Sequence, residues 1–290
     1  MEQQLIELYL WVCRAYDKRP DLKYQRLSNN SRPLFTDQEL LTMYLFGHLQ
    51  GHFSQRRIYD YVRRHWHEWF PRLPSYQACN RRLNDLAETF PVVLDELLRT
   101  AHKQQTAGAD RLLDSLPIML ASGSRATQGK VARELADAGY CASKQTFYHG
   151  VKLHLLSIKR YKVLPLPESL CLTQASMHDL TALRQLLPWP QNCALFADKA
   201  YADACTRAAL VQHGSDLCTP DKGYRGRTEL PRRLWSRFVS AMRQPAESLF
   251  HWLLQRTNLQ DASQVRSANG LLTHCYGKLT AAFYLLLLNS

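Results

Sequence analysis

The first hundred residues of the chain repeat apolar side chains at helical spacing, with polar side chains between them. Thr36 and Glu39 form a capping box, in which hydroxyl and carboxylate satisfy each other's backbone amides, and an apolar helix is predicted to follow. A second helix is expected to begin after Ser54 and a third after Pro74. The pattern therefore predicts a small all-helical N-terminal domain over residues 1–102.

The second of these helices carries arginines on the faces that its apolar side chains leave free. Arg56 and Arg57 are the first of them. Short helices joined by a glycine-bearing turn, with one arginine-rich member, are typical of helix-turn-helix-like DNA-binding modules. A basic helical bundle with solvated arginines has the same pattern, so the sequence leaves both interpretations open.

From residue 103 onwards the pattern favours strands. Strands are expected over 112–119, 147–158 and 161–166, the last two as antiparallel neighbours. Helix and strand then alternate, with helices expected over 179–187 and 202–212 and strands over 193–197 and 216–218. Three consecutive strands followed by this alternation predict an α/β domain over 103–290, with a ribonuclease H-like mixed sheet flanked by helices.

The charge balance adds an anionic partner to this picture. Lys and Arg number 37 against 25 Asp and Glu, a formal net charge of +12. DNA is the preferred partner and a membrane is not, because no apolar stretch approaches the roughly 20 residues of a membrane span. The segment Met1–Gln4 lacks the features of a signal peptide, so a cytoplasmic, nucleoid-associated protein is expected. The eight cysteines contain no C-x-x-C pair and are expected in the core, reduced.

Three carboxylates stand in apolar segments, where an ionised group is costly unless a cation receives it. Asp114 lies on the first, central strand of the predicted sheet, Asp198 at the carboxyl end of the fourth, and Glu247 on a later helix. Ligands of open α/β sheets gather at the carboxyl ends of strands, so these side chains are expected to converge. Converging carboxylates suit Mg²⁺ or Mn²⁺, and two such ions can activate an oxygen nucleophile for attack on a phosphodiester.

Each of these acids also has an ordinary interpretation. Aspartate is common in turns at strand ends, which is the alternative role for Asp114. It is also common at helix caps, which is the alternative role for Asp198. Asp110 competes with Asp114 for the role of metal ligand, because the two lie on the same face of a strand. Asp114 is preferred because Asp110 stands at the polar beginning of that strand.

The segment between 219 and 244 is the densest in positive charge and directly precedes Glu247. It is predicted to hold DNA phosphates near the carboxylates, with Trp235 available for stacking on unpaired bases. A solvated basic face is the alternative. The DNA-binding residues predicted here are Lys222, Arg225, Arg227, Arg232, Arg233, Arg237 and Arg243.

At these residues the chain resembles bacterial insertion-sequence transposases of the DDE type. The resemblance is carried, in order, by 113–118, 147–154, 197–201 and the pair Arg243 and Glu247. It implies that Asp114, Asp198 and Glu247 bind two catalytic Mg²⁺ ions, with Mn²⁺ as an alternative. It also implies an enzyme that cuts DNA at the inverted repeats of its own mobile element and joins those ends to target DNA, as a homodimer or larger assembly.

Two details of the resemblance concern the surroundings of the acids. Related enzymes have a His–Asp-type pair where this chain has His178 and Asp179, which implies a supporting role beside the metal ligands; a helix cap by Asp179 fits equally. They also often place a Tyr-Arg-Glu-Lys signature around the glutamate, of which only Arg243 is kept here. Pro245 predicts either a helix that begins just before it or a kinked one.

The sequence leaves two further functions open. A nuclease without strand transfer would need the same fold and metals. A transposase-derived DNA-binding protein that has lost catalysis would account for the incomplete signature around Glu247.

Overall fold

The computed structural model describes residues 1–19, 33–102, 110–221 and 230–288. Contacts divide the chain into two compact units, one made of Met1–Lys103 with Leu253–Ser290 and the other of Gln104–Trp252. The sequence predicts 103–290 as one domain instead, and its boundary falls in 103–109, outside the described residues. Residues after 252 group with the N-terminal helices because their apolar side chains are buried among those helices.

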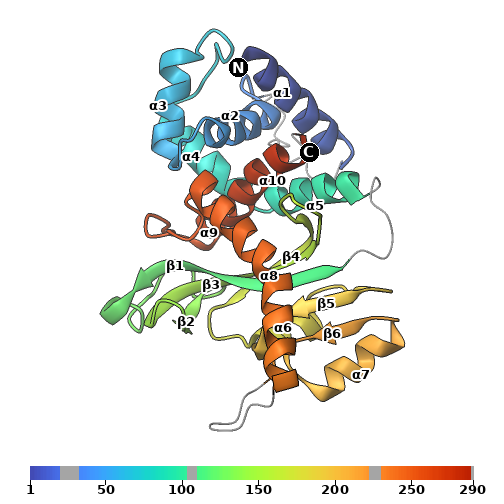
Figure 1. Cartoon of the computed structure of the whole chain (residues 1–290). Coiled ribbons are helices and arrows are strands. Elements are labelled where there is room, and N and C mark those ends of the chain that lie inside the picture. Colours follow the sequence, from blue (N-terminus) through green and yellow to red (C-terminus); the bar gives the residue numbers. More distant parts are fainter. Residues whose placement is uncertain (20–32, 103–109, 222–229, 289–290) are drawn as a thin grey trace. The chain divides into compact units, whose positions relative to one another are not determined.

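The first unit, which we call the helical unit, contains only helices among its described residues (Figure 1). Thr36 and Glu39 form the predicted capping box, with Glu39 N donating to Thr36 Oγ1 at 3.1 Å, and Ser54 caps the next helix. The third predicted segment is divided into two helices. The elements are α1 (Glu2–Asp17), α2 (Asp37–Leu49), α3 (Gln55–His65), α4 (Tyr76–Asp85), α5 (Thr89–His102), α9 (Ala268–Leu272), a π-helical turn (Thr273–Gly277) and α10 (Lys278–Leu288).

Two close approaches fix the packing of the helical unit. A Cβ added at Gly47 would lie 2.5 Å from a side-chain carbon of Ile58, so α2 and α3 can touch only because this position is glycine. At Gly277 the added atom would lie 2.6 Å from the ring of Tyr44. The C-terminal segment is thus packed tightly against α2, although more than 200 residues separate them.

The second unit, the sheet unit, contains a mixed sheet. β1 (Arg111–Ser122) is central, antiparallel to β3 (Thr146–Ile158) and parallel to β5 (Ala194–Ala197), which pairs in parallel with β6 (Asp216–Cys218). β2 (Asp137–Cys141) and β4 (Leu166–Gln174) follow one another along the other edge of β3. The order β2-β3-β1-β5-β6, with helices on the sheet, is the ribonuclease H-like arrangement that the sequence predicts.

The strand predicted over 161–166 is wrong. Residues 161–165 form the connection, and β4 begins only at Leu166. Lys162 has φ 57, a left-handed conformation that interrupts extended backbone. Pro167 is tolerated because β4 lies at an edge of the sheet, where a missing N–H need not face a neighbouring strand. β2 is not among the strands predicted from the sequence.

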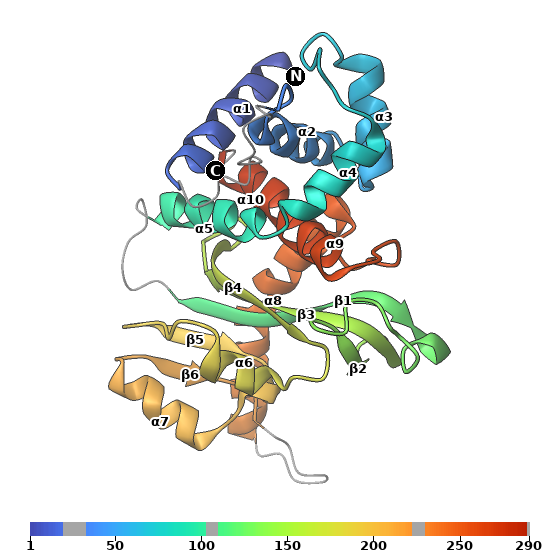
Figure 2. The same cartoon turned by 180° about the vertical axis from the view of Figure 1, so that it is seen from behind.

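Helices cover both faces of the sheet. Successive residues of β1 point to opposite faces, so Leu113 packs with Leu183 and Leu210 while Leu112 packs with Val239. α8 passes in front of the strands in Figure 1, and α6 lies in front in Figure 2. The covering helices are α6 (Asp179–Gln185), α7 (Ala204–Gln212) and α8 (Leu230–Thr257), with 3₁₀ turns at Gly123–Arg125 and Lys199–Tyr201. Among the described residues, no helix is long and apolar enough to cross a membrane.

Candidate active site

Asp114 and Asp198 lie side by side because β1 and β5 are parallel and in register. Leu113 pairs with Ala197, which is the last residue of β5, so each aspartate is the next residue of its chain segment. β1 continues to Ser122, which excludes the strand-end turn proposed for Asp114. Asp198 does cap the following 3₁₀ turn, its Oδ1 accepting from Lys199 N at 2.6 Å. The pair therefore marks the carboxyl end of β5, where ligands of such sheets gather.

Arg243 of α8 lies between the two aspartates. Its Nη2 is 3.2 Å from Asp114 Oδ2, and its Nη1 is 3.6 Å from Asp198 Oδ1. The side chains of Arg243, Asp114 and Asp198 are 12%, 18% and 44% exposed. The sequence assigns Arg243 to DNA, whereas in the structure its guanidinium contacts the acids, because α8 packs against Leu112 on the face to which Asp114 also points.

The pKa of Asp114 shows how strongly this position disfavours charge. Burial raises it to about 6, and the charge of Arg243 and the hydrogen bond from Ser115 N, at 2.9 Å, only partly oppose that rise. The charges of Asp198 and Glu247 raise the pKa of Asp114 further. Three acids therefore act on one another here, although they come from distant parts of the sequence.

Glu247 is the least enclosed of the three acids. It lies one helical turn after Arg243 and is exposed. α8 runs through Pro245, so of the two predicted alternatives the helix that begins just before this proline is excluded. The ring nitrogen cannot donate to the carbonyl of Ala241, which loses its helical partner. Within the described residues, no three His, Cys, Asp or Glu side chains are grouped closely enough to hold a metal ion.

The donor chemistry of the pair nevertheless fits a hard divalent cation. Asp114 and Asp198 offer only carboxylate oxygens, which are the ligands preferred by Mg²⁺ and Mn²⁺. Both already face a cation, the guanidinium of Arg243. Asp110 does not belong to this site. It precedes β1, and its carbonyl accepts from Lys159 N at 2.8 Å, at the opposite end of the β1–β5 pairing.

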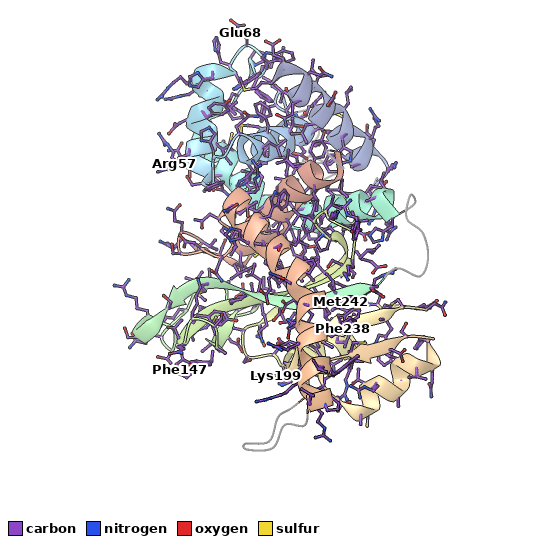
Figure 3. The ribbon with its side chains drawn as sticks, viewed as in Figure 1. Arg57, Glu68, Phe147, Lys199, Phe238 and Met242 are labelled. Atoms are coloured by element: carbon purple, nitrogen blue, oxygen red, sulfur yellow. The ribbon has the colours of Figure 1, made fainter. Side chains whose placement is uncertain are left out.

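Apart from Arg243, the predicted DNA-binding arginines of α8 lie on its first turns. Arg232, Arg233 and Arg237 are exposed. Trp235 is partly exposed while its Nε1 donates to Thr219 O at 3.0 Å, and Phe238 and Met242 lie further along the helix (Figure 3). Lys222, Arg225 and Arg227 lie outside the described residues.

In the helical unit, Arg56 and Arg57 are both exposed on α3, and Arg57 points away from the other helices in Figure 3. Gly47 lets α2 and α3 pack closely, and DNA binding by this pair stays a prediction. Arg82, by contrast, contacts another residue of the helical unit, because it donates to the buried Asp37.

A second polar cluster lies on the opposite sheet face, and Asp179 is its one residue to which the sequence points. Asp179 Oδ1 accepts from Lys152 Nζ at 2.9 Å and lies 3.9 Å from Nδ1 of the buried His154. His154 Nε2 is 2.9 Å from Thr173 Oγ1. The alternation of side chains along β3 predicts the sheet face on which these residues lie. It does not predict that α6 covers that face. His178 caps α6 through Nδ1, which accepts from Leu180 N at 3.3 Å, so capping falls to His178 rather than Asp179.

Comparison with known proteins adds the family. A family model described as "Transposase DDE domain" matches residues 121–284, more than half of the chain. The chain belongs to the DDE transposase family. DDE transposases generally use divalent metals and act on DNA. Asp198, Arg243 and Glu247 lie inside the matched residues, and Asp114 lies before the first of them. A search of curated proteins and a search of solved structures found no match.

Proposed function

We propose that this DDE transposase cuts DNA at the ends of its own insertion sequence and joins those ends to target DNA. The observation that carries the proposal is the in-register pair of Asp114 and Asp198, which share the guanidinium of Arg243 at the carboxyl end of β5. Its support is that the model of a family of metal-using DNA enzymes matches residues 121–284, which include Asp198 and Arg243 but not Asp114.

The three acids have distinct roles in this proposal. Asp114 and Asp198 hold the divalent ions, and Glu247 completes the ligand set from α8. Two bound Mg²⁺ ions, or Mn²⁺ in their place, would supply an activated oxygen nucleophile and stabilise the leaving oxygen at the phosphodiester. Asp114 has to be ionised for this role, and burial, which raises its pKa to about 6, keeps it uncharged in acid.

The basic residues position the DNA. Arg232, Arg233 and Arg237 are exposed on the helix that carries Glu247, so they can contact phosphates beside the acids. Lys222, Arg225 and Arg227 are proposed to extend this contact. The α2–α3 pair, with Arg56 and Arg57, is proposed to bind the inverted repeats, and the active form is a dimer or larger assembly that holds two DNA ends.

One observation favours a second candidate function. Glu247 is exposed, and the described acids form no closed metal-binding group. A transposase-derived protein that binds DNA without cutting it would have this arrangement. A metal-dependent nuclease without strand transfer shares all the residues of the main proposal and differs only in its products.

The deciding experiment uses labelled duplexes from the DNA that flanks the gene, where inverted repeats are expected, with a supercoiled target plasmid and Mg²⁺. The wild type is expected to cut at the repeat and to join the cut end to the plasmid. Asp114→Asn, Asp198→Asn and Glu247→Gln should each abolish both products. Asp110→Asn is the matched control, because it makes the same change four residues away, outside the site.

The outcomes separate the candidates. Cutting without joining, even with pre-cut ends, identifies the nuclease. Binding without cutting in Mg²⁺ or Mn²⁺ identifies the non-catalytic protein. If Asp114→Asn cut at the rate of Asp110→Asn, the assignment of the acids would be wrong.

A further inference from the structure

The helical unit contains a pocket of about 240 Å³ that opens to solvent between α3, α4, the loop before α9 and the start of α10. A single water needs only about 10–15 Å³, so the pocket has room for a ligand. Its lining has three formal cations and no carboxylate. We call it the basic pocket and define it by Arg56, Tyr76, Asn80, Gln264, Arg266 and Lys278.

Lys278 gives the basic pocket a buried positive charge. Its side chain belongs to a residue that is only 3% exposed, and its Nζ donates to the neutral carbonyl of Asn258 at 3.2 Å. Burial lowers the pKa of Lys278 to about 8, and the charge of Asp261 only partly opposes this. Among the described residues no carboxylate forms an ion pair with it. A buried ammonium without an anion is costly, so this lysine favours the entry of one.

The two arginines of the basic pocket stand at its exposed side. Arg266 donates through Nη1 to the carbonyls of Ser263 and Val265, at 2.6 and 2.8 Å, and these acceptors do not neutralise its charge. Arg56 is paired with Asp60 at 2.8 Å, and its guanidinium lies 5.0 Å from the centre of the Tyr76 ring. Arg266 and Lys278 therefore provide the unneutralised charge, and Arg56 is a weaker contributor.

The remaining lining side chains suit a nucleobase rather than a bare anion. Tyr76 is a partly buried aromatic ring, and both it and the flat guanidinium of Arg56 are surfaces on which bases stack. The side-chain amides of Asn80 and Gln264 have no hydrogen-bond partner among the described residues. Amides in this state can pair with the edge of a base, since they offer a donor and an acceptor together.

We propose that the basic pocket binds one unstacked nucleotide of DNA, with its phosphate at Lys278 and Arg266 and its base against Tyr76 and Asn80. This inference rests on the proposed function for the presence of DNA, and it adds a second contact type to it. A base inside a duplex cannot enter such a pocket, because it is stacked and paired. The expected ligand is therefore an unpaired nucleotide, such as one in an overhang at a cut DNA end.

Binding is measured by fluorescence anisotropy in EDTA, with a labelled blunt duplex and with the same duplex carrying a three-nucleotide overhang. The wild type should prefer the overhang. Asn80→Ala and Arg266→Gln should weaken overhang binding by about tenfold and blunt-duplex binding by much less. The matched control is Arg81→Gln, which removes an exposed charge from the same helix, α4, outside the pocket, and should change neither.

Lys278→Met distinguishes a lysine that holds its charge for a ligand from one whose role is purely structural. If Lys278 holds its charge for a ligand, its replacement should raise the Tm of the free protein and weaken overhang binding. Inorganic phosphate should raise the Tm of the wild type and not that of Lys278→Met. A lower Tm for this variant, with overhang binding intact, would overturn the proposal.

Two results would reassign or remove the site. Equal loss of blunt-duplex and overhang binding, or an equal effect of Arg81→Gln, would mean a general basic surface. Binding of free deoxynucleotides by calorimetry without any overhang preference would mean a small-molecule site. Because the assay contains no metal, the outcome is independent of cleavage: an overhang preference in a protein that never cuts DNA would keep the pocket and refute the proposed function.

Discussion

Replacement of Arg243 by methionine tests how Asp114 is held in the sheet unit. Methionine keeps the apolar stem of the arginine and removes its charge, so the buried Asp114 loses the guanidinium at 3.2 Å. When the cation is lost, the pKa of a carboxylate in this position rises further. The carboxylate takes up a proton once its pKa exceeds the pH of the solution.

Proton uptake by Asp114 sets an upper limit on the loss of stability in Arg243→Met. The pKa of Asp114 is about 6 with Arg243 present, and a displacement by one pH unit is worth about 1.36 kcal/mol. At pH 8 the loss of stability through Asp114 is therefore at most about 3 kcal/mol, and at pH 6 it is less than about 1 kcal/mol. Asp198 adds little, because its side chain is 44% exposed and water replaces the arginine.

The assay is urea unfolding in EDTA, followed by tryptophan fluorescence at pH 6, 7 and 8. The destabilisation should grow across this range for Arg243→Met. Arg237→Met, on an exposed turn of the same helix, should show no such trend. A loss that is the same at all three pH values would mean that Arg243 acts through packing alone, and the electrostatic reasoning would be refuted.

Three further predictions concern Asp114, a bound metal ion and the Asp37–Arg82 ion pair. Asp114→Asn should stabilise the protein by up to about 3 kcal/mol at pH 8 and by almost nothing at pH 4, because a raised carboxyl pKa costs stability only where the group is ionised. Unfolding curves at both pH values test this, with Asp110→Asn as the control. Mn²⁺ affinity, measured by electron paramagnetic resonance, should rise with pH through about 6, and a flat profile would exclude Asp114 as a ligand. Asp37→Asn should cost about 3 kcal/mol in urea, near the lower end for a broken buried ion pair because Arg82 is 24% exposed, and an unchanged midpoint would contradict this.

Local signals in the sequence predicted most of the elements. The capping box at Thr36 is confirmed because it depends on residues only three apart, and the predicted helix start at Ser54 is confirmed as well. The strands around Asp114 and before Asp198 are confirmed because their apolar runs are buried from both sides. β2 was missed because it is a short edge strand with a glycine at its centre, which weakens every strand signal.

The geometry of the candidate site needed information that no local pattern contains. That Asp114 stands beside Asp198 depends on the register of β1 with β5. That Arg243 meets both depends on which face of α8 packs on the sheet, and the basic segment around it favoured DNA. Lys278, in turn, is the first residue of an apolar helix and has no sequence feature that separates it from an ordinary surface lysine.

The helical unit is built from the two parts of the chain that flank the sheet unit in sequence. Its N-terminal helices are therefore synthesised well before its C-terminal helices. Leu271, Cys275 and Phe283 are fully buried in it, yet they are translated more than 160 residues after α5. At roughly 5–20 residues per second, α1 to α5 wait about 10–40 s on the ribosome before their partner helices emerge. The part of the α2 surface that α10 covers stays exposed during that time. A message that is cut short yields no complete basic pocket, so only fully translated protein can use it.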